Sequence, residues 1–415
     1  MKFGGMNNVD FVTGLDIGTS WIKVVVAEAR DGKPVVVHAS KEVTLGLRKG
    51  AIVDVAELSQ SVRRALEPVK QFSKNALKNI FVSIGTPQVK MQASRGIVAV
   101  SSANGEIYQG DVERAVKASQ AVNLGQNRAI IHTLTKEFIV DGVGDIADPL
   151  GLTGSRLEVQ SFVLDAFLPH VSGLMRAVEL SGGQVGGLIF SPLVAARGAL
   201  SKRQKDLGAV VIDIGAGTTG MAVYEEDRLL GAAKFPVGSG NISNDLAIGL
   251  KISVDAAEEV KLHHGSCFAR EVSQKDQVDL RPFAADAKST VSRKFIAEII
   301  GSRTEEIFGL INDELKRLGK TNNLAGGAIF VGGGAKLPGL TDLAKQEFRI
   351  SAQIGCSVMN EWRDNGGTFN DVLEDPEFVS AFGLALWGIY GEHTGNPNKQ
   401  TAGFNLKNWL RYFTP

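Results

Sequence analysis

Two stretches of the chain share one pattern of apolar and polar positions. Residues 12–27 read VTGLDIGTSWIKVVVA, and residues 207–224 read LGAVVIDIGAGTTGMAVY. Both have an Asp-Ile-Gly core followed by small and hydroxylated residues and then by an apolar run, and in the second stretch a β-branched apolar run, 210–212, leads into this core. Apolar runs separated by turn residues are typical of β-hairpins. The sequence therefore predicts two related hairpins, one in each half, and hence two related domains.

The rest of the pattern predicts a mixed α/β chain. From about residue 90 to 169, short strands, one helix and a loop at 142–155 indicate an inserted α+β subdomain. Residues 272–283 are expected to form a polar hairpin or loop. The apolar segment 378–390 is too short to span a bilayer and is expected to be a core helix. Helices are predicted at 54–69, 109–121, 171–180, 193–200, 254–263, 293–318 and in segments ending at 250 and 348; strands are predicted at 79–84, 96–100, 128–134, 137–140, 157–167, 188–190 and 328–331.

The turns of both hairpins have residues suited to binding phosphate. Small residues leave backbone N–H groups free to converge on an oxyanion, and hydroxyls and one lysine add further donors. A carboxylate at a strand end could hold a hydrated Mg²⁺. Two such turns suggest two domains that close on a nucleotide from opposite sides. The residues are Gly18, Thr19, Ser20 and Lys23 in the first hairpin, Gly215, Ala216, Gly217, Thr218 and Thr219 in the second, and Asp213 for the metal.

A second glycine-rich turn follows the predicted strand at 328–331. Gly332, Gly333 and Gly334 allow very close backbone approach, most usefully by the ribose and base of a nucleotide. On the helix predicted at 254–263, Glu258 and Lys261 share one face.

A dinucleotide-binding fingerprint is the main rival interpretation of the second hairpin. Gly215, Gly217 and Gly220 match G-x-G-x-x-G, but that motif requires a helix immediately afterwards. Here an apolar run broken by Glu-Glu-Asp follows, which continues a hairpin. The context therefore excludes the fingerprint.

Composition narrows the function further. Lys plus Arg and Asp plus Glu number 45 each, which gives no reason to expect a nucleic-acid partner. Cys267 and Cys356 make no disulfide framework, which fits a reducing cytosol, and the N-terminus lacks a signal-peptide pattern. His263 and His264 beside Cys267 lack the further ligands that a zinc site needs. His132 and His170 lie among apolar neighbours and are expected to be structural.

The C-terminal residues have the pattern of a membrane-surface helix. Residues 391–403 are polar and rich in turn formers, which predicts a flexible linker. In residues 404–413, apolar side chains recur at helical spacing and basic residues lie beside them, as in interfacial helices; docking on the protein body is the alternative. The residues are Phe404, Leu406, Lys407, Trp409, Leu410, Arg411 and Phe413.

Taken together, the two hairpins, a small-residue helix at 193–200 and the glycine turn at 332–334 resemble the actin/sugar-kinase/DnaK-type ATPase superfamily. Further stretches are similar to the FtsA family, bacterial actin homologues that tether FtsZ filaments to the membrane during division. These are RAIIHTLTKEFIVDG at 128–142, DPLGLTGSRLEV at 148–159, VKLHHG at 260–265 and IIGSRTEEIFGLINDEL at 299–315. The resemblance runs from about residue 11 to the tail, and the family's amphipathic membrane helix matches the tail pattern.

The resemblance implies an actin-like two-domain ATPase fold with duplicated sheet-and-helix cores, an inserted α+β subdomain and a C-terminal amphipathic helix. Subdomain IA would comprise residues 9–90, 171–207 and about 360–390, IC the insert 91–170, IIA 208–246 and 325–359, and IIB 247–324, followed by the linker 391–403 and the helix 404–415. In the site, Asp16 and Asp213 would serve Mg²⁺, both turns would hold the phosphates of ATP, and Gly238, Glu258, Lys261 and Gly332 to Gly334 would surround the ribose and adenine.

The resemblance also implies partners and a location. The C-terminal peptide of FtsZ would bind subdomain IIB, with 293–318 as the face, and IC would contact other division proteins and filament subunits. The chain would self-associate into filaments on anionic lipid, at the cytoplasmic face of the inner membrane at the division site.

One departure from the superfamily concerns hydrolysis. In chaperones and actins, the strand after the inserted region ends with an acid or amide that positions the attacking water. The corresponding residues here are Phe190, Ser191, Pro192 and Leu193, and none is a suitable group. We therefore predict ATP binding with slow or absent hydrolysis and no catalytic residue.

Two alternatives stay open at this point. A PilM-like actin homologue of a pilus assembly system also carries the inserted subdomain. A small-molecule kinase of the same superfamily would need a catalytic aspartate between the lobes. The aspartates of the inserted region stand in no convincing motif; they are Asp111, Asp141, Asp145, Asp148 and Asp165.

Overall fold

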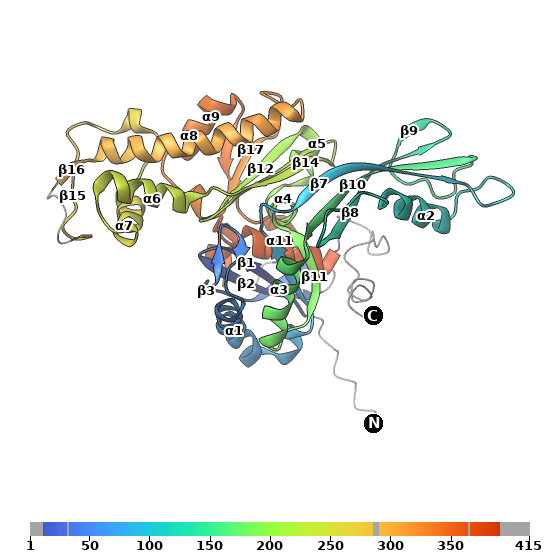
Figure 1. Cartoon of the computed structure of the whole chain (residues 1–415), viewed down its shortest axis with the longest axis horizontal. Helices are drawn as coiled ribbons and strands as arrows, with labels where there is room; N and C mark the ends of the chain where they lie inside the picture. The colour runs from blue at the N-terminus through green and yellow to red at the C-terminus, as the bar shows by residue number, and fades with distance from the viewer. Residues whose placement is uncertain (1–10, 31–32, 285–289, 364–365, 391–415) are drawn as a thin grey trace.

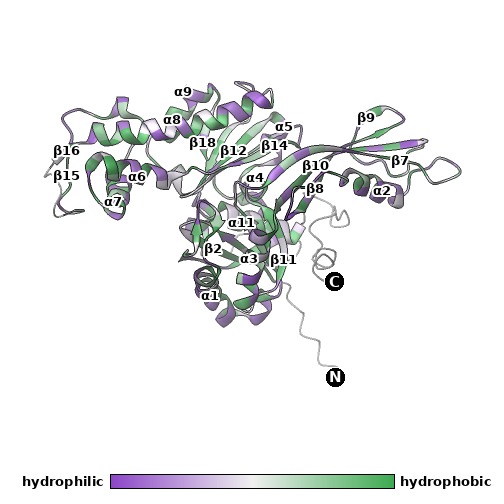
Figure 2. Cartoon of the chain, viewed as in Figure 1, coloured by the Kyte–Doolittle hydropathy of each residue, from purple (hydrophilic) through white to green (hydrophobic). Residues whose placement is uncertain are grey.

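The computed structural model describes residues 11–30, 33–284, 290–363 and 366–390. The predicted linker and amphipathic helix, residues 391–415, lie outside these ranges. The described residues form two lobes, each built on a five-stranded sheet, and a four-stranded sheet that projects sideways (Figure 1). Hydrophobic residues are concentrated in the strands of the sheets, and hydrophilic residues on the outer turns of α1 and α8 (Figure 2). None of the described helices combines the length and apolarity needed to cross a membrane.

The first lobe is a sheet with the strand order β11-β6-β1-β2-β3, covered by helices on both faces. Val24 and Val26 of β2 pack toward α1, whereas Val25 and Ala27 pack toward α11. Because both faces are buried, this strand is a continuous apolar run. The elements are β1 (Phe11–Ile17), β2 (Trp21–Arg30), β3 (Lys33–Val43), β4 (Leu47–Arg48), β5 (Ala51–Ile52), α1 (Val55–Phe72), β6 (Ile80–Ile84), α3 (Leu168–Leu180), β11 (Val185–Phe190), α4 (Ser191–Ala199) and α11 (Val379–Tyr390).

The second lobe repeats the hairpin plan, with the strand order β14-β13-β12-β17-β18. Its hairpin has the same register as the first: Asp213 pairs with Gly220 as Asp16 pairs with Lys23. The long helix α8 packs its apolar stripe on this lobe through Phe308, which contacts Phe330 and Phe348. The elements are α5 (Lys202–Leu207), β12 (Ala209–Ile214), β13 (Thr219–Glu225), β14 (Arg228–Phe235), α6 (Ser239–Leu250), α7 (Val254–His264), β15 (Gln277–Asp279), β16 (Thr290–Ser292), α8 (Arg293–Arg317), β17 (Gly327–Val331), α9 (Leu340–Phe348) and β18 (Ala352–Ile354). The short helix α10 (Asn370–Glu374) packs instead on the first lobe, where Leu373 is buried with Val25 and Phe382.

The projecting sheet has its own small core and the strand order β7-β10-β8-β9. Helix α2 covers one face through Ala115, which is buried with Val140, Leu157 and Val159. The elements are β7 (Lys90–Ala99), α2 (Gln109–Ser119), β8 (Arg128–Val140), β9 (Val143–Ile146) and β10 (Arg156–Phe167).

Several predicted boundaries were wrong in this part of the chain. The two strands predicted at 128–134 and 137–140 are the single strand β8. Its pairing with β10 shifts by one residue at Lys136, so a bulge absorbs the polar interruption that suggested two strands. The predicted loop 142–155 contains β9, which pairs with β8. Helix α3 begins at Leu168 rather than 171, because Pro169 is tolerated in the first turn of a helix.

One other prediction was partly right. The polar segment 272–283 contains β15, whose partner β16 lies beyond the predicted range. His263 and His264 pack their rings against Phe283, and within the described ranges no three His, Cys, Asp or Glu side chains come together as a metal site would require.

His132 is buried where the projecting sheet meets the first lobe. Its Nε2 accepts a hydrogen bond from the Phe190 N–H at 3.2 Å, and burial lowers its pKa to about 4. The folded protein thus holds His132 neutral, whereas the unfolded chain binds a proton below pH 6.5. The contribution of His132 to stability is therefore complete above pH 6.5 and is lost as the pH falls toward 4.

We expect the wild-type protein to lose about 2 kcal/mol more stability than His132→Gln between pH 7 and pH 5. Glutamine can still accept the hydrogen bond from Phe190 but does not titrate. The measurement is urea denaturation of both proteins at the two pH values. Equal losses in the two proteins would contradict the assignment, since His170, whose pKa burial also lowers to about 4, is present in both.

Candidate functional site

The turn between β1 and β2 brings the carboxylate of Asp16, near the end of β1, next to the ammonium group of Lys23 on β2. The Gly18 N–H donates to the Trp21 carbonyl at 3.1 Å and closes the turn. Asp16 forms an ion pair with Lys23 at 3.4 Å, and its other oxygen accepts a hydrogen bond from Ser83 at 2.8 Å. The carboxylate is thus held in place from two sides at the end of β1.

The turn between β12 and β13 has the same construction. The Gly215 N–H donates to the Thr218 carbonyl at 2.9 Å, and Asp213 lies 3.5 Å from Lys234 Nζ. Burial raises the pKa of Asp213, Lys234 opposes this effect, and the negative charge of Asp16 adds to it. The two aspartates come from different lobes, yet they are close enough to influence each other's charge.

The two turns meet directly. A Cβ on Gly217 would lie 2.7 Å from Thr19 Oγ1 and 3.1 Å from the Cα of Lys49. The Gly50 N–H donates to Thr19 Oγ1 at 3.2 Å. Only glycine at 217 permits this approach, so the two lobes touch at residues that the sequence predicts to bind phosphate.

The start of α6 packs on the second turn. The Ser239 N–H donates to the Gly215 carbonyl, and the Gly240 N–H to the Ala216 carbonyl, both at 2.8 Å. A Cβ on Gly238 would collide with these carbonyls. This glycine is therefore explained by packing at the edge of the site.

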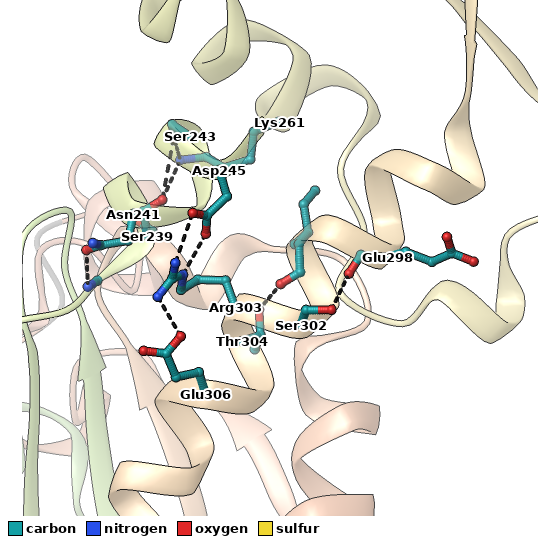
Figure 3. A network of polar contacts seen from close by, with 12 residues as sticks. Ser239, Asn241, Ser243, Asp245, Lys261, Glu298, Ser302, Arg303, Thr304 and Glu306 are labelled. Carbon is teal, nitrogen blue, oxygen red and sulfur yellow. Dashed lines mark hydrogen bonds and ion pairs between the residues drawn. The ribbon is translucent and has the colours of Figure 1, made fainter. Parts of the chain in front are cut away.

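Lys261 joins α7 to the start of α6. Its Nζ donates to the hydroxyl of Ser243 at 2.9 Å and to the Ser239 carbonyl at 3.3 Å (Figure 3). It also donates to Glu258 at 2.6 Å. The Lys261 side chain is buried, whereas that of Glu258 is partly exposed. The pair predicted from helical spacing therefore exists, and Glu258 is its accessible member.

The three glycines after β17 differ in their surroundings. Gly332 has a φ of +83°, and side chains at Gly332 or Gly334 would collide with the end of β12. Gly333 alone of the three is exposed. Packing thus explains Gly332 and Gly334, and Gly333 is the one that a ligand can approach.

Sequence reasoning missed several groups that reach the site. Ser83 holds Asp16, Lys234 pairs with Asp213, and Gly50 bonds to Thr19; none stands in a recognisable motif. Buried side-chain hydroxyls without a hydrogen-bond partner in the described residues occur at Thr44 and Ser191. Thr44 donates its N–H to the Ser20 carbonyl, so it adjoins the first turn.

This set of groups fits a phosphate chain with a divalent cation. Two carboxylates could hold a hydrated Mg²⁺, and two lysines with the turn N–H groups could neutralise phosphate oxygens. The buried hydroxyls of Thr44 and Ser191 still have hydrogen-bonding capacity for a ligand.

The sequence matches known families at two places. Residues 210–383 match the profile described as cell division protein FtsA, and residues 87–164 match the SHS2 domain inserted in FtsA. Cell division protein FtsA of Bacillus subtilis is 35% identical over 380 residues, which cover 91% of this chain and 83% of that protein. The chain belongs to the FtsA family of cell division proteins. FtsA of Escherichia coli is 26% identical over 416 residues, which cover 96% of this chain and 97% of that protein.

Solved structures confirm the actin-like fold with its inserted subdomain. A chain of the PilM-PilN type IV pilus biogenesis complex superimposes with a TM-score of 0.67 at 19% identity, covering 91% of this chain and 98% of that chain. MreB5 of Spiroplasma citri bound to AMPPNP gives 0.53 at 14% identity, covering 91% and 95%. These likenesses concern the fold, whereas the sequence places the chain with FtsA rather than with PilM.

Proposed function

We propose that this member of the FtsA family binds ATP, self-associates on the cytoplasmic face of the inner membrane, and tethers FtsZ filaments there while recruiting later division proteins. The observation that carries the proposal is the contact between Gly217 and Thr19, which brings the two phosphate-suited turns together from opposite lobes. Such an arrangement lets a nucleotide hold the two lobes in one relative orientation.

Within the site, Asp16 and Asp213 would hold Mg²⁺, and the two turns would hold the phosphates. Lys261, Glu258 and Gly333 would lie toward the ribose and base. The bound Mg²⁺ would neutralise phosphate charge. Hydrolysis would be slow or absent, because residues 190–193 provide no acid or amide to position water.

The partner surface that we assign to the FtsZ peptide is on α8. A groove of about 190 Å³ lies between α8, α9 and the segment that follows α7. Glu298 and Glu305 line it on one side and Arg270 on another, so it offers charges of both signs to an extended peptide.

A polar contact connects this helix to α6, whose first residues pack on the second turn. Arg303 of α8 binds Asp245 of α6 through two contacts of 2.6 and 2.9 Å, and also binds Glu306 (Figure 3). Helix α6 begins at Ser239, against the second turn. A bidentate pair of this kind is geometrically specific, so it would couple the position of α8 to that of α6, which packs on the second turn.

The projecting sheet is our candidate for contacts with other division proteins and filament subunits. A cleft of about 390 Å³ lies at its base and is lined by Lys90, Arg128 and Asp165. Membrane attachment is assigned to residues 404–415, whose pattern is that of an interfacial helix.

Vesicle flotation with ATP and FtsZ tests the proposal. The vesicles contain phosphatidylethanolamine and phosphatidylglycerol, and the chains are the full protein and one truncated after Gln400. We expect only the full chain to float and to carry FtsZ with it. Glu305→Lys should float without FtsZ, whereas Asp313→Lys, an exposed acid on α8 outside the groove, should still carry it.

Other outcomes would contradict parts of the proposal. If the truncated chain floats as well as the full chain, the membrane contact lies elsewhere. If neither floats, the tether is excluded and a pilus-type or soluble role gains support. If Glu305→Lys and Asp313→Lys behave alike, the groove is not the FtsZ site.

A further inference from the structure

Ser191 carries a buried hydroxyl that finds no partner within the described part of the chain. It is the first residue of α4 and is 3% exposed, and its Oγ has no hydrogen-bond partner among the described residues. Other buried hydroxyls on helices are satisfied: Ser59 and Thr304 donate to the carbonyls four residues earlier at 2.7 and 2.8 Å. Leaving a buried hydroxyl unpaired is unfavourable, so this one points to a ligand.

The hydroxyl lies beside residues that lead to the first turn. Because Phe190 pairs with Ile84, Ser191 lies beside Gly85. A Cβ on Gly85 would lie 3.7 Å from Ser191 Oγ and would meet no other atom within 4 Å. Gly85 in turn packs against Gly50, which bonds to Thr19. Gly85 therefore lies between Ser191 and the first turn, and apart from Ser191 Oγ no atom fills the space beside its Cα.

The second hairpin lies on the other side of Ser191. A Cβ on Gly220 would lie 3.2 Å from both Pro192 Cγ and Lys234 Nζ, and Gly220 pairs with Asp213. The first turn of α4 thus adjoins the candidate metal ligand and its lysine. The first N–H groups of a helix have no partner within the helix and favour anions. Pro192 has no N–H, so in α4 this applies to the N–H groups of the residues on either side of it.

The order of groups along the site indicates which phosphate reaches Ser191. Lys261 and Ser239 lie at the α6 side of the second turn, where we place the ribose. From there the contacts run through the second turn to Thr19 of the first turn, and Gly50 and Gly85 link Thr19 to Ser191. We infer that the Ser191 hydroxyl and the first turn of α4 bind the terminal phosphoryl group of a nucleoside triphosphate and thereby distinguish it from a diphosphate. This inference rests on the proposed nucleotide binding.

Helix α4 is well placed to respond to that group. It packs against α11 of the first lobe and against β12 and β13 of the second (Figure 1). A terminal phosphoryl group bound at the first residue of α4 would therefore affect the packing of this helix against both lobes.

Calorimetric titration of the full chain with Mg²⁺ and either AMPPNP or ADP tests the inference. For Ser191→Ala we expect AMPPNP to bind about 10-fold more weakly, as for loss of a hydrogen bond to a charged group, and ADP affinity to change by less than about 2-fold. Ser59→Ala, which removes a buried hydroxyl on α1, should change neither the AMPPNP affinity nor the ADP affinity. Urea denaturation without nucleotide should show Ser191→Ala at least as stable as the wild type, since no bond within the chain is lost.

Each contrary result has a separate meaning. Equal weakening of AMPPNP and ADP, or no weakening, overturns the terminal-phosphoryl assignment while nucleotide binding stands. Marked destabilisation of ligand-free Ser191→Ala also overturns it, because the hydroxyl would then have a partner in the chain. Failure of the wild type to bind either nucleotide overturns both this inference and the proposed nucleotide site.

Discussion

Replacing Gly217 by valine is expected to weaken ATP binding by about 100-fold while the protein still folds. A Cβ at this position would lie 2.7 Å from Thr19 Oγ1 and 3.1 Å from the Cα of Lys49, and both atoms belong to the first lobe. Overpacking at such a contact costs about 1–3 kcal/mol, and 3 kcal/mol corresponds to roughly 150-fold in affinity. Since Gly217 lies in a turn outside both cores, the strain opposes the approach of the lobes rather than folding.

The measurement is calorimetric titration with Mg²⁺ and ATP, together with urea denaturation. Gly309→Val is the matched control, because Gly309 is an exposed position of α8 where a Cβ would meet nothing within 4 Å. It should bind ATP as the wild type does. If Gly217→Val binds ATP with unchanged affinity, the contact between the two turns does not form the site.

Asp213→Asn is expected to weaken ATP binding in Mg²⁺ by about 10- to 100-fold, the range seen when a group that orients a bound metal is lost. With EDTA in place of Mg²⁺, the variant should bind ATP at least as tightly as the wild type. The reason is that a carboxylate beside a polyphosphate is repulsive when no cation lies between them. The raised pKa of Asp213, caused mainly by burial and also by the nearby charge of Asp16, shows that this carboxylate is already disfavoured as an anion.

The reversal between the two conditions separates a metal ligand from a structural residue. Asp227→Asn, at the exposed end of the β13–β14 turn, serves as the control and should change affinity in neither condition. A loss for Asp213→Asn that is equal with and without Mg²⁺ would assign this residue a structural role.

The local periodicity of apolar residues was sufficient to predict most helices and strands. Both hairpins, α1, α8 and α11 were predicted because an apolar period of two or 3.6 is set by neighbouring residues. The repeated Asp-Ile-Gly pattern also predicted two related lobes, and combined motifs indicated the FtsA family. Local patterns failed to predict the bounds of a strand that are set by a partner distant in the sequence. Strand β8 is continuous because β10 pairs along its length and a bulge accommodates Lys136.

The sequence by itself determined the fold class, the family and the two phosphate-suited turns, since each depends on contiguous residues. Only the tertiary structure decided which groups complete the site. Ser83 reaches Asp16 from 67 positions away, Gly50 reaches Thr19 from 31, and Lys234 reaches Asp213 from 21. No local period encodes such contacts, because they follow from how strands order themselves in a sheet and how the two lobes pack. That the Ser191 hydroxyl is buried, with no partner in the ranges that the structure describes, likewise became visible only after β11 had been placed beside β6.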